Sequence, residues 1–361
     1  MPKFRRIGVL TSGGDAPGMN AAVRAVTRCA NAHGVEVVGI YEGYKGLIEG
    51  NVKVFGPRDV SNIINHGGTV LYSARCPEFK EEWGMQKAKE TCEKYEIDGI
   101  VAIGGDGTFR GATDLSLRGI PCIGIPGTID NDITATEYSI GYDTALNTVV
   151  EMVDRLRDTC ESHARCNVVE IMGRNAGYIA LNTGIAVGAT AICLKEIGIT
   201  EDEIIARIEA AKADGKRNFI IMVAEGMGGE FGENLTTKIE AVTGIETRFA
   251  RLAHVVRGGS PSLRDRVMGS EMGAKAVEML LDGKSNMVVC YRHGEIRTSE
   301  ITWALALDKL FKSDYAGYKK VDIEKLLAPY TPEEREIMHQ FCATKLEKMK
   351  ESYRIAMEIS N

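Results

Sequence analysis

Short apolar runs alternate with helical stripes along the chain, and glycine-rich turns separate them. The mainly apolar runs have the length of buried strands, and they lie at residues 7–10, 35–40, 100–103, 122–125, 168–171 and 219–223. Between them, apolar residues recur every three or four positions, as from Met19 to Ala30 before Gly34 and from Leu146 to Leu156. This order predicts an α/β fold of mainly parallel sheets with helices on both faces.

The tail carries its own helix signal. Thr331-Pro332-Glu333-Glu334 has the pattern of a capping box with proline at the first helical position. An apolar stripe follows at Met338, Cys342, Leu346, Met349, Tyr353 and Ala356. We expect this helix to pack on its own subunit, with an oligomer contact as the alternative.

Composition narrows the class of protein. A length of 361 residues exceeds one hydrophobic core and predicts two domains, although no linker marks the boundary. The net charge of −6 gives no overall basic field for nucleic acid or an anionic membrane. No apolar run is long enough for a membrane span, and the apolar run after the basic start is too short for a signal peptide. The nine cysteines form no CxxC pair, which favours a reducing cytoplasm.

Three glycine-rich loops follow predicted strands, at residues 11–18, 104–108 and 126–132. Glycine lets backbone N–H groups approach phosphate oxygens, although each loop alone could equally be a tight turn without a ligand. The chain contains neither GxxxxGK[ST] nor GxGxxG. Because parallel strands bind ligands at their carboxyl ends, the loops together indicate a phosphate-binding site.

Acidic and basic residues lie on or near these loops. Asp106 stands between two glycines, where a carboxylate commonly holds Mg²⁺. Asp130 and Asp132 flank an asparagine and could hold a metal, take a proton or cap a turn. Guanidinium groups bind two phosphate oxygens at once, and the basic candidates are Arg165, Arg174, Arg248, His254 and Arg257.

Five segments occur in the order typical of one enzyme family. They are the Leu-Thr-Ser-Gly-Gly-Asp-Ala-Pro-Gly-Met-Asn of 10–20, the Gly-Gly-Asp-Gly-Thr of 104–108, the Pro-Gly-Thr-Ile-Asp-Asn-Asp of 126–132, the Met-Gly-Arg of 172–174 and the His-Val-Val-Arg-Gly-Gly-Ser-Pro of 254–261. From about residue 5 to about residue 310 the chain resembles the 6-phosphofructokinases, specifically the ATP-dependent bacterial type. The resemblance does not account for the last fifty or so residues.

The resemblance implies transfer of the γ-phosphoryl group of ATP-Mg to the 1-hydroxyl of fructose 6-phosphate, a step of glycolysis. Asp130 would be the general base, with Thr128 and Asp132 arranging the reacting groups, and Arg174 with the backbone N–H of Gly14 stabilising the transferred group. Asp106 would hold Mg²⁺. The ATP side would comprise Gly14, Arg75, Cys76, Gly105, Asp106, Gly107 and Thr108.

The sugar-phosphate side would comprise Thr128, Asp130, Met172, Gly173, Arg174, Glu225, His254 and Arg257, with Arg165 and Arg248 of a neighbouring subunit. A shared site implies a homo-oligomer, and a homotetramer is expected. The implied ATP-binding domain spans residues 1–142 plus about 258–307. The sugar-phosphate domain spans 143–257 plus about 308–361, including the C-terminal helical extension.

The resemblance also bears on the phosphoryl donor and on a candidate effector site. Pyrophosphate-using relatives typically carry Asp where this chain has Gly107 and Lys where it has Gly127, so ATP is expected and pyrophosphate is the alternative. Arg24, Arg28, Arg157 and Lys216 match an effector site for nucleotide or phosphoenolpyruvate in the family, or form a solvated basic face.

Two other classes of protein fit the sequence motifs less well. A lipid or NAD kinase shares the Gly-Gly-Asp-Gly turn but not the loops at 126–132 and 254–261. A catalytically silent nucleotide-sensing regulator would normally lose the base or the metal-binding carboxylate, whereas Asp106, Asp130 and Arg174 are all present. Other acceptors, such as sedoheptulose 7-phosphate, stay open.

Overall fold

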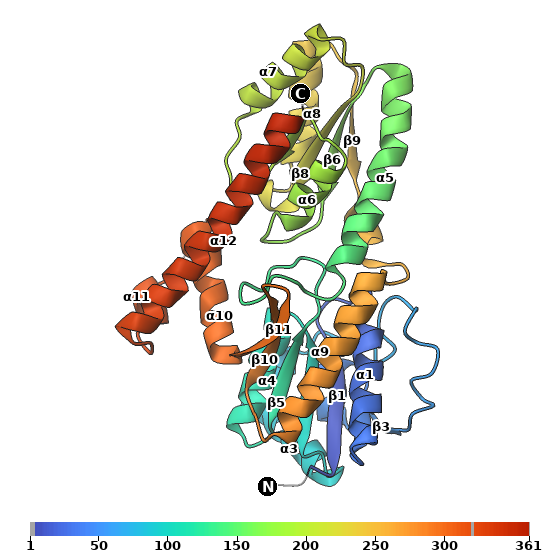
Figure 1. The fold of residues 1–361 in the computed structure, drawn as a ribbon, viewed down its shortest axis with the longest axis vertical. Coiled ribbons are helices and arrows are strands. Elements are labelled where there is room, and N and C mark those ends of the chain that lie inside the picture. Colours follow the sequence, from blue (N-terminus) through green and yellow to red (C-terminus); the bar gives the residue numbers. More distant parts are fainter. Residues whose placement is uncertain (1–3, 319–320, 361) are drawn as a thin grey trace. The chain divides into compact units, whose positions relative to one another are not determined.

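The computed structural model describes residues 4–318 and 321–360. The chain folds into two compact units (Figure 1). The first comprises Met1–Ile129, Ile133–Thr144 and Arg257–Asp308, and the second comprises Asp130–Asp132, Ala145–Val256 and Lys309–Asn361. The outer limits of the predicted domains, residues 1 and 361, lie outside the described residues.

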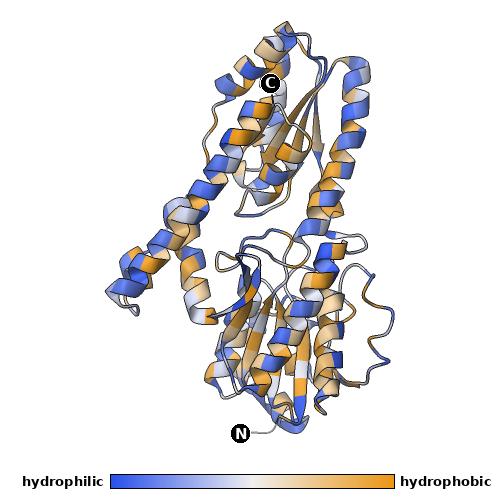
Figure 2. Cartoon of the chain, in the orientation of Figure 1, coloured by the Kyte–Doolittle hydropathy of each residue, from blue (hydrophilic) through white to orange (hydrophobic). Residues whose placement is uncertain are grey.

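The first unit is built on a seven-stranded sheet. Its order is β11 (Glu295–Glu300), β10 (Met287–Arg292), β5 (Cys122–Pro126), β4 (Gly99–Gly104), β1 (Arg6–Ser12), β2 (Glu36–Ile40) and β3 (Val52–Phe55). The pairings from β10 to β2 are parallel, which confirms the predicted class, whereas β11 and β3 pair antiparallel at the edges. Every residue of β4 is buried, as its mainly apolar sequence predicts. The strands of this sheet are largely coloured as hydrophobic in Figure 2.

Helices cover this sheet. They are α1 (Met19–Ala32), α2 (Gly43–Glu49), η1 (Pro77–Lys80), α3 (Glu82–Lys94), α4 (Asp106–Leu117) and α9 (Leu263–Leu281). The helices α1 and α9 pack closely because two glycines of α9 face α1. A Cβ atom at Gly273 would lie 2.8 Å from the carbonyl oxygen of Ala22, and one at Gly269 would lie 2.9 Å from that of Gly18.

The second unit has a four-stranded parallel sheet in the order β7 (Ala191–Cys193), β8 (Phe219–Ala224), β6 (Cys166–Ile171) and β9 (Thr247–Arg251). Its helices are α6 (Tyr178–Ala186), α7 (Glu201–Ala213), η2 (Glu225–Met227), α8 (Phe231–Thr243), η3 (Ala253–Arg257), η4 (Phe311–Tyr315), α11 (Ile323–Leu327) and α12 (Pro332–Ile359). Buried residues of α7, α8 and the sheet form one core.

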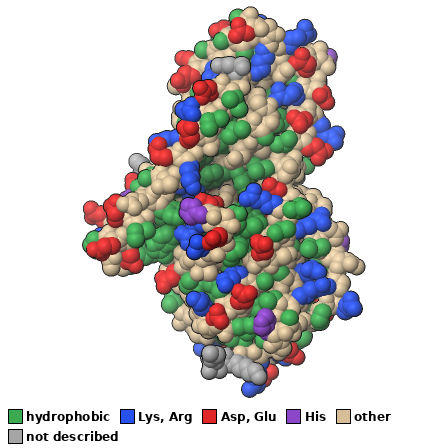
Figure 3. Space-filling view, in the orientation of Figure 1, with side chains coloured by type: hydrophobic (Ala, Val, Ile, Leu, Met, Phe, Trp, Pro, Cys, Tyr) green, Lys and Arg blue, Asp and Glu red, His purple; other side chains and the backbone are tan. Residues whose placement is uncertain are grey.

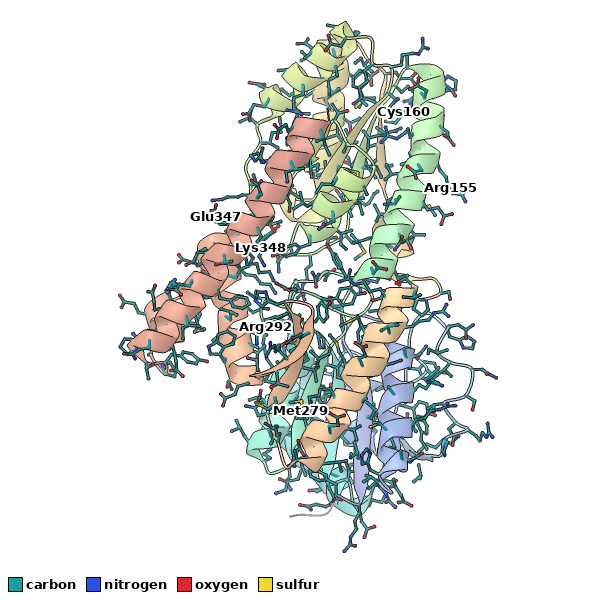
Figure 4. The ribbon with its side chains drawn as sticks, viewed as in Figure 1. Arg155, Cys160, Met279, Arg292, Glu347 and Lys348 are labelled. Atoms are coloured by element: carbon teal, nitrogen blue, oxygen red, sulfur yellow. The ribbon has the colours of Figure 1, made fainter. Side chains whose placement is uncertain are left out.

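Two helices, α5 (Tyr142–His163) and α10 (Ile301–Leu310), begin in the first unit and end in the second. The part of α5 in the second unit is amphipathic. Arg155 is exposed, whereas Cys160 is buried, with its thiol donating to the carbonyl of Phe219 on β8 (Figure 4). The predicted stripe from Leu146 to Leu156 therefore belongs to this helix.

The tail helix α12 begins as predicted. Thr331 and Glu334 form the capping box, and Pro332 opens the helix. Met338, Cys342, Met349 and Ala356 are buried, and α12 packs on α6, β7 and η4 of its own unit. Packing on the same chain is therefore confirmed.

The described part of the chain contains no helix that combines the length and the apolar character needed to cross a bilayer. Acidic and basic side chains are interspersed over the face shown in Figure 3.

Candidate active site

Three segments of the first unit meet just after the carboxyl ends of β1 and β4. The Thr108 hydroxyl donates to the carbonyl of Ser12 at 3.0 Å, and the Ser73 hydroxyl donates to the carbonyl of Gly13 at 2.5 Å. Gly13 has a φ of 86°, a conformation that glycine adopts without strain. The structure thus joins the loop of Gly14, the loop of Gly105–Thr108 and the segment leading to Arg75 and Cys76.

The loop of residues 104–108 is the start of α4. Gly105 occupies the N-cap position, and Asp106 is the first helical residue. Backbone N–H groups at a helix start attract phosphate. Gly107 and Gly105 face open space, because an added Cβ atom at either position meets no atom within 4 Å. Room therefore exists on this side of the loop for a ligand.

Asp106 has an ion-pair partner on its own helix. Its carboxylate lies 2.7 Å from the guanidinium of Arg110, and its side chain is 25% exposed. Within the described residues, no group of three or more acidic, histidine or cysteine side chains could hold a metal by itself. Magnesium that arrives with substrate phosphates needs only one or two protein carboxylates, so Asp106 fits this kind of site.

Arg257 extends over the glycine-rich turn that follows β1 in the first unit. Its guanidinium donates to the carbonyl of Asp15 at 3.3 Å, and a Cβ atom at Gly14 would lie 2.6 Å from Nη1. Gly14 must therefore be glycine for Arg257 to lie there. His254, which precedes it on η3, is exposed and belongs to the second unit.

The acidic loop after β5 is buried. Asp130, Asn131 and Asp132 are 5%, 5% and 7% exposed, and Asn131 has a φ of 50°. The Asp132 carboxylate lies 2.9 Å from the ammonium of Lys312, a buried lysine of η4. Sequence reasoning missed this partner, since nothing in the local pattern links the two positions. The ion pair neutralises Asp132, which reduces repulsion between the acidic loop and an anion.

The Met172–Gly173–Arg174 loop is tied to Glu225 at the carboxyl ends of β6 and β8. The Glu225 carboxylate accepts from the backbone N–H of Gly173 at 3.3 Å and from that of Arg174. Arg174 has a φ of 53°, uncommon for a residue with a side chain and often found at functional sites. Glu225 thus holds Arg174 in a backbone conformation that leaves its side chain exposed.

Arg165 and Arg248 meet at the amino ends of the neighbouring strands β6 and β9. Arg165 donates to Glu246 at 2.7 Å, and Arg248 donates to the same carboxylate. The hydrogen bond from Arg165 lowers the pKa of Glu246. Because Arg165 precedes β6 and Arg174 follows it, the length of the strand, about 20 Å for six residues, separates them.

The predicted effector residues fall into two pairs. Arg24 and Arg28 lie on α1, where burial and the charge of Arg28 lower the pKa of Arg24. Arg157 donates to the side chain of Asn218 at 3.0 Å and to the carbonyl of Val187.

Lys216 follows α7 in the chain and contacts the end of α12. Its ammonium lies 3.2 Å from the carbonyl oxygen of Ser360. Arg207 binds the same turn, at the hydroxyl of Ser360 and the carbonyl of Met357. Burial, Arg157 and Arg207 lower the pKa of Lys216. Three cations therefore share this part of the second unit, and Arg207 was not predicted from the sequence.

The predicted residues thus form one set in each unit. Gly14, Asp106 and Arg257 belong to the first, whereas Asp130, Arg174 and Glu225 belong to the second. Convergence of the two sets on one donor and acceptor stays a prediction.

Comparison with known proteins supplies the family. Residues 6–280 match the family model described as phosphofructokinase. The chain belongs to the phosphofructokinase family. A Clostridium perfringens relative, named ATP-dependent 6-phosphofructokinase 1, is 52% identical over 85% of this chain and 96% of its own length. A Bacillus pumilus ATP-dependent 6-phosphofructokinase is 54% identical over 81% of this chain and 91% of its own.

Solved structures of this phosphofructokinase family share the fold. Phosphofructokinase from Saccharomyces cerevisiae matches with a TM-score of 0.82 and 31% identity over 95% of this chain. This chain spans 50% of the yeast chain. A pyrophosphate-dependent phosphofructokinase from Marinobacter aquaeolei, at 21% identity and a TM-score of 0.73, supports the fold alone.

Proposed function

We propose that the protein is an ATP-dependent 6-phosphofructokinase that forms fructose 1,6-bisphosphate and ADP in glycolysis. Two observations agree in support of this proposal. Relatives that are about half identical to this chain are named ATP-dependent, and positions 107 and 127 of this chain are both glycine. A cytoplasmic location is expected for such an enzyme.

The roles of the residues follow from the reaction. Phosphoryl transfer needs positioning and charge stabilisation more than covalent chemistry. Asp130 accepts the proton of the 1-hydroxyl as its oxygen attacks the γ-phosphorus, and Thr128 and Asp132 arrange the reacting groups. Arg174 and the backbone N–H of Gly14 stabilise the transferred group.

Asp106 is the residue that would hold Mg²⁺, in exchange for its pairing with Arg110. A magnesium ion held there would supply positive charge that offsets the negative charge of the donor phosphates. The neighbouring N–H groups of α4, together with Arg75 and Cys76, form the nucleotide side.

A neighbouring subunit completes the sugar-phosphate site in this proposal. Arg165 and Arg248 lie at the amino ends of β6 and β9, away from Arg174 and Glu225 at the carboxyl ends. The length of β6 between Arg165 and Arg174, about 20 Å, favours contributions from two chains to one small substrate. A symmetric homotetramer, in which each subunit lends its arginines to the next, satisfies this geometry.

The choice of donor tests the proposal. We expect turnover of fructose 6-phosphate with ATP-Mg in a coupled assay and none above background with pyrophosphate. Gly107→Asp is expected to lower kcat/KM for ATP about tenfold or more, because a carboxylate at the start of α4 repels phosphate. The open space at position 107 lets the variant fold.

Gly107→Asn is the matched control, since it has the same size without the charge, and it is expected to keep most of the activity with ATP. Robust turnover with pyrophosphate alone would overturn the assignment of ATP. Equal losses in the Asp and Asn variants would show that space, and not charge, selects the donor.

Regulation is proposed at the cation cluster of Arg157, Arg207 and Lys216, with Arg24 and Arg28 as the second part of the effector site. ADP or phosphoenolpyruvate is expected to change the fructose 6-phosphate saturation curve. The end of α12 already supplies hydrogen-bond acceptors to Lys216 and Arg207, so an anion has to displace it.

A chain that stops at Ile355 is therefore expected to respond to about fivefold lower concentrations of the effector, because the competing acceptors are removed. Ser360→Ala, which keeps the backbone carbonyl, is the milder control. The proposal would be overturned if the fructose 6-phosphate saturation curve were hyperbolic and unchanged by both effectors, in the full chain and in the shortened one.

A further inference from the structure

The second unit contains an open cavity of about 530 Å³. Arg174 and Glu225, which belong to the proposed sugar-phosphate site, line it. Lys195, which follows β7, and Tyr318, which follows η4, line the same cavity, and the proposed mechanism assigns neither of them a role. The cavity thus extends the site beyond the residues that the family motifs mark.

The side chains that line the cavity carry a net positive charge. Arg251 is neutralised by Glu170, at 2.6 Å, and it also donates to the carbonyl of Gly229. Glu225 accepts from backbone N–H groups and compensates one cation. Lining cations at 174, 195 and 251 outnumber lining carboxylates at 170 and 225, a balance that suits a phosphate group carrying about −2 charges.

Lys195 is the cation most available to a ligand. Its side chain is exposed at the cavity, and it forms no ion pair with a described residue. Burial raises the pKa of the neighbouring Glu196 carboxylate, and the charge of Lys195 partly opposes that rise. The ammonium lies 5.0 Å from the centre of the Tyr318 ring. A cation–π contact holds a lysine without consuming its hydrogen-bond donors.

Tyr318 is fixed on both sides. Its hydroxyl donates to the Glu196 carboxylate at 3.0 Å, and that carboxylate group also accepts from the N–H of Gly177 at 2.8 Å. The ring packs on Gly226, where an added Cβ atom would lie 2.7 Å from the ring and 3.1 Å from the carbonyl oxygen of Arg174. A tail residue therefore contacts the two loops that carry Glu225 and Arg174.

We propose that Lys195 is a further ligand of the phosphorylated sugar, binding a phosphate oxygen, and that Tyr318 is the residue that positions it. This inference rests on the proposed function and deepens it. The long stem and single point charge of lysine reach across an open cavity in a way that the paired Arg251 cannot.

Lys195→Met tests the ligand role. We expect the KM for fructose 6-phosphate and its calorimetric dissociation constant, measured without nucleotide, to rise about tenfold or more. The kcat and the KM for ATP are expected to stay within about twofold, because the reacting atoms and the nucleotide loops are unchanged. Lys195→Arg is expected to restore most of the affinity.

Lys238→Met is the matched control, because this lysine of α8 is paired with Glu201 and Asp202 and lies outside the cavity lining. Its constants are expected to match those of the wild type. Tyr318→Phe keeps the ring and loses the hydrogen bond to Glu196, and we expect an intermediate rise of about threefold in the same KM.

The outcomes separate the two proposals. If the wild type turns over fructose 6-phosphate and Lys195→Met binds it equally well, the role of Lys195 is overturned and the proposed function stands. If the wild type neither binds nor turns over this sugar phosphate, both are overturned. Equal losses with Lys238→Met would show a general charge effect and would also overturn the specific role.

Discussion

Replacement of Asp130 by serine is expected to lower kcat with ATP and fructose 6-phosphate about a hundredfold or more. The variant loses the carboxylate that accepts the proton of the attacking hydroxyl. The nucleotide loops belong to the first unit, so the dissociation constant for ATP is expected to stay within about twofold. Steady-state kinetics and calorimetric titration with ATP measure the two quantities.

Two further variants separate chemistry from folding. Asp130 is only 5% exposed, so Asp130→Asn keeps the shape of the buried side chain and is expected to lose kcat similarly. Asp154→Ser changes an exposed aspartate of α5 and is expected to leave kcat unchanged. Wild-type turnover in Asp130→Ser would remove Asp130 from the mechanism.

Asp265→Ala is expected to lower the free energy of unfolding by about 4 kcal/mol. This carboxylate of α9 is fully buried. One oxygen accepts from the Tyr138 hydroxyl and the Gly141 N–H at 2.5 and 2.7 Å. The other accepts from the N–H and the hydroxyl of Thr144 at 2.8 and 2.5 Å. Truncation leaves these donors without the carboxylate, a loss that urea denaturation measures.

Asp282→Ala is the matched control, because Asp282 is exposed at the other end of α9. Its effect is expected to be below about 0.5 kcal/mol. A loss below about 1 kcal/mol in Asp265→Ala would mean that water or rearrangement satisfies the donors, and that the carboxylate does not anchor this loop.

The loops of the candidate site were predictable because their signals are local. Glycines directly after a buried strand allow the backbone to turn sharply, and the predicted loop of residues 104–108 lies at such a turn, where α4 begins. The capping box at Thr331 is equally local, and so is the apolar stripe of α12. In each case neighbouring residues fix the backbone, so the pattern carries the information.

The long-range polar partners of these residues were not predictable in the same way. Lys312 neutralises Asp132 across 180 positions, and Tyr318 reaches Glu196 across 122. Arg207 binds the turn of Ser360 across 153. Any of the chain's many polar or charged side chains could have filled these places, and no spacing rule selects one.

The sequence alone determined the α/β class, most of the strands and helices, the glycine loops and the family resemblance, because each depends on residues close together in the chain. Only the tertiary structure decided that β3 and β11 run antiparallel, that Arg257 lies over Gly14, and that a tail residue lines the cavity beside Arg174. The physical reason is that these contacts join residues far apart in the sequence. Which distant residues meet is decided by the packing of all helices and strands together, and no local pattern encodes it.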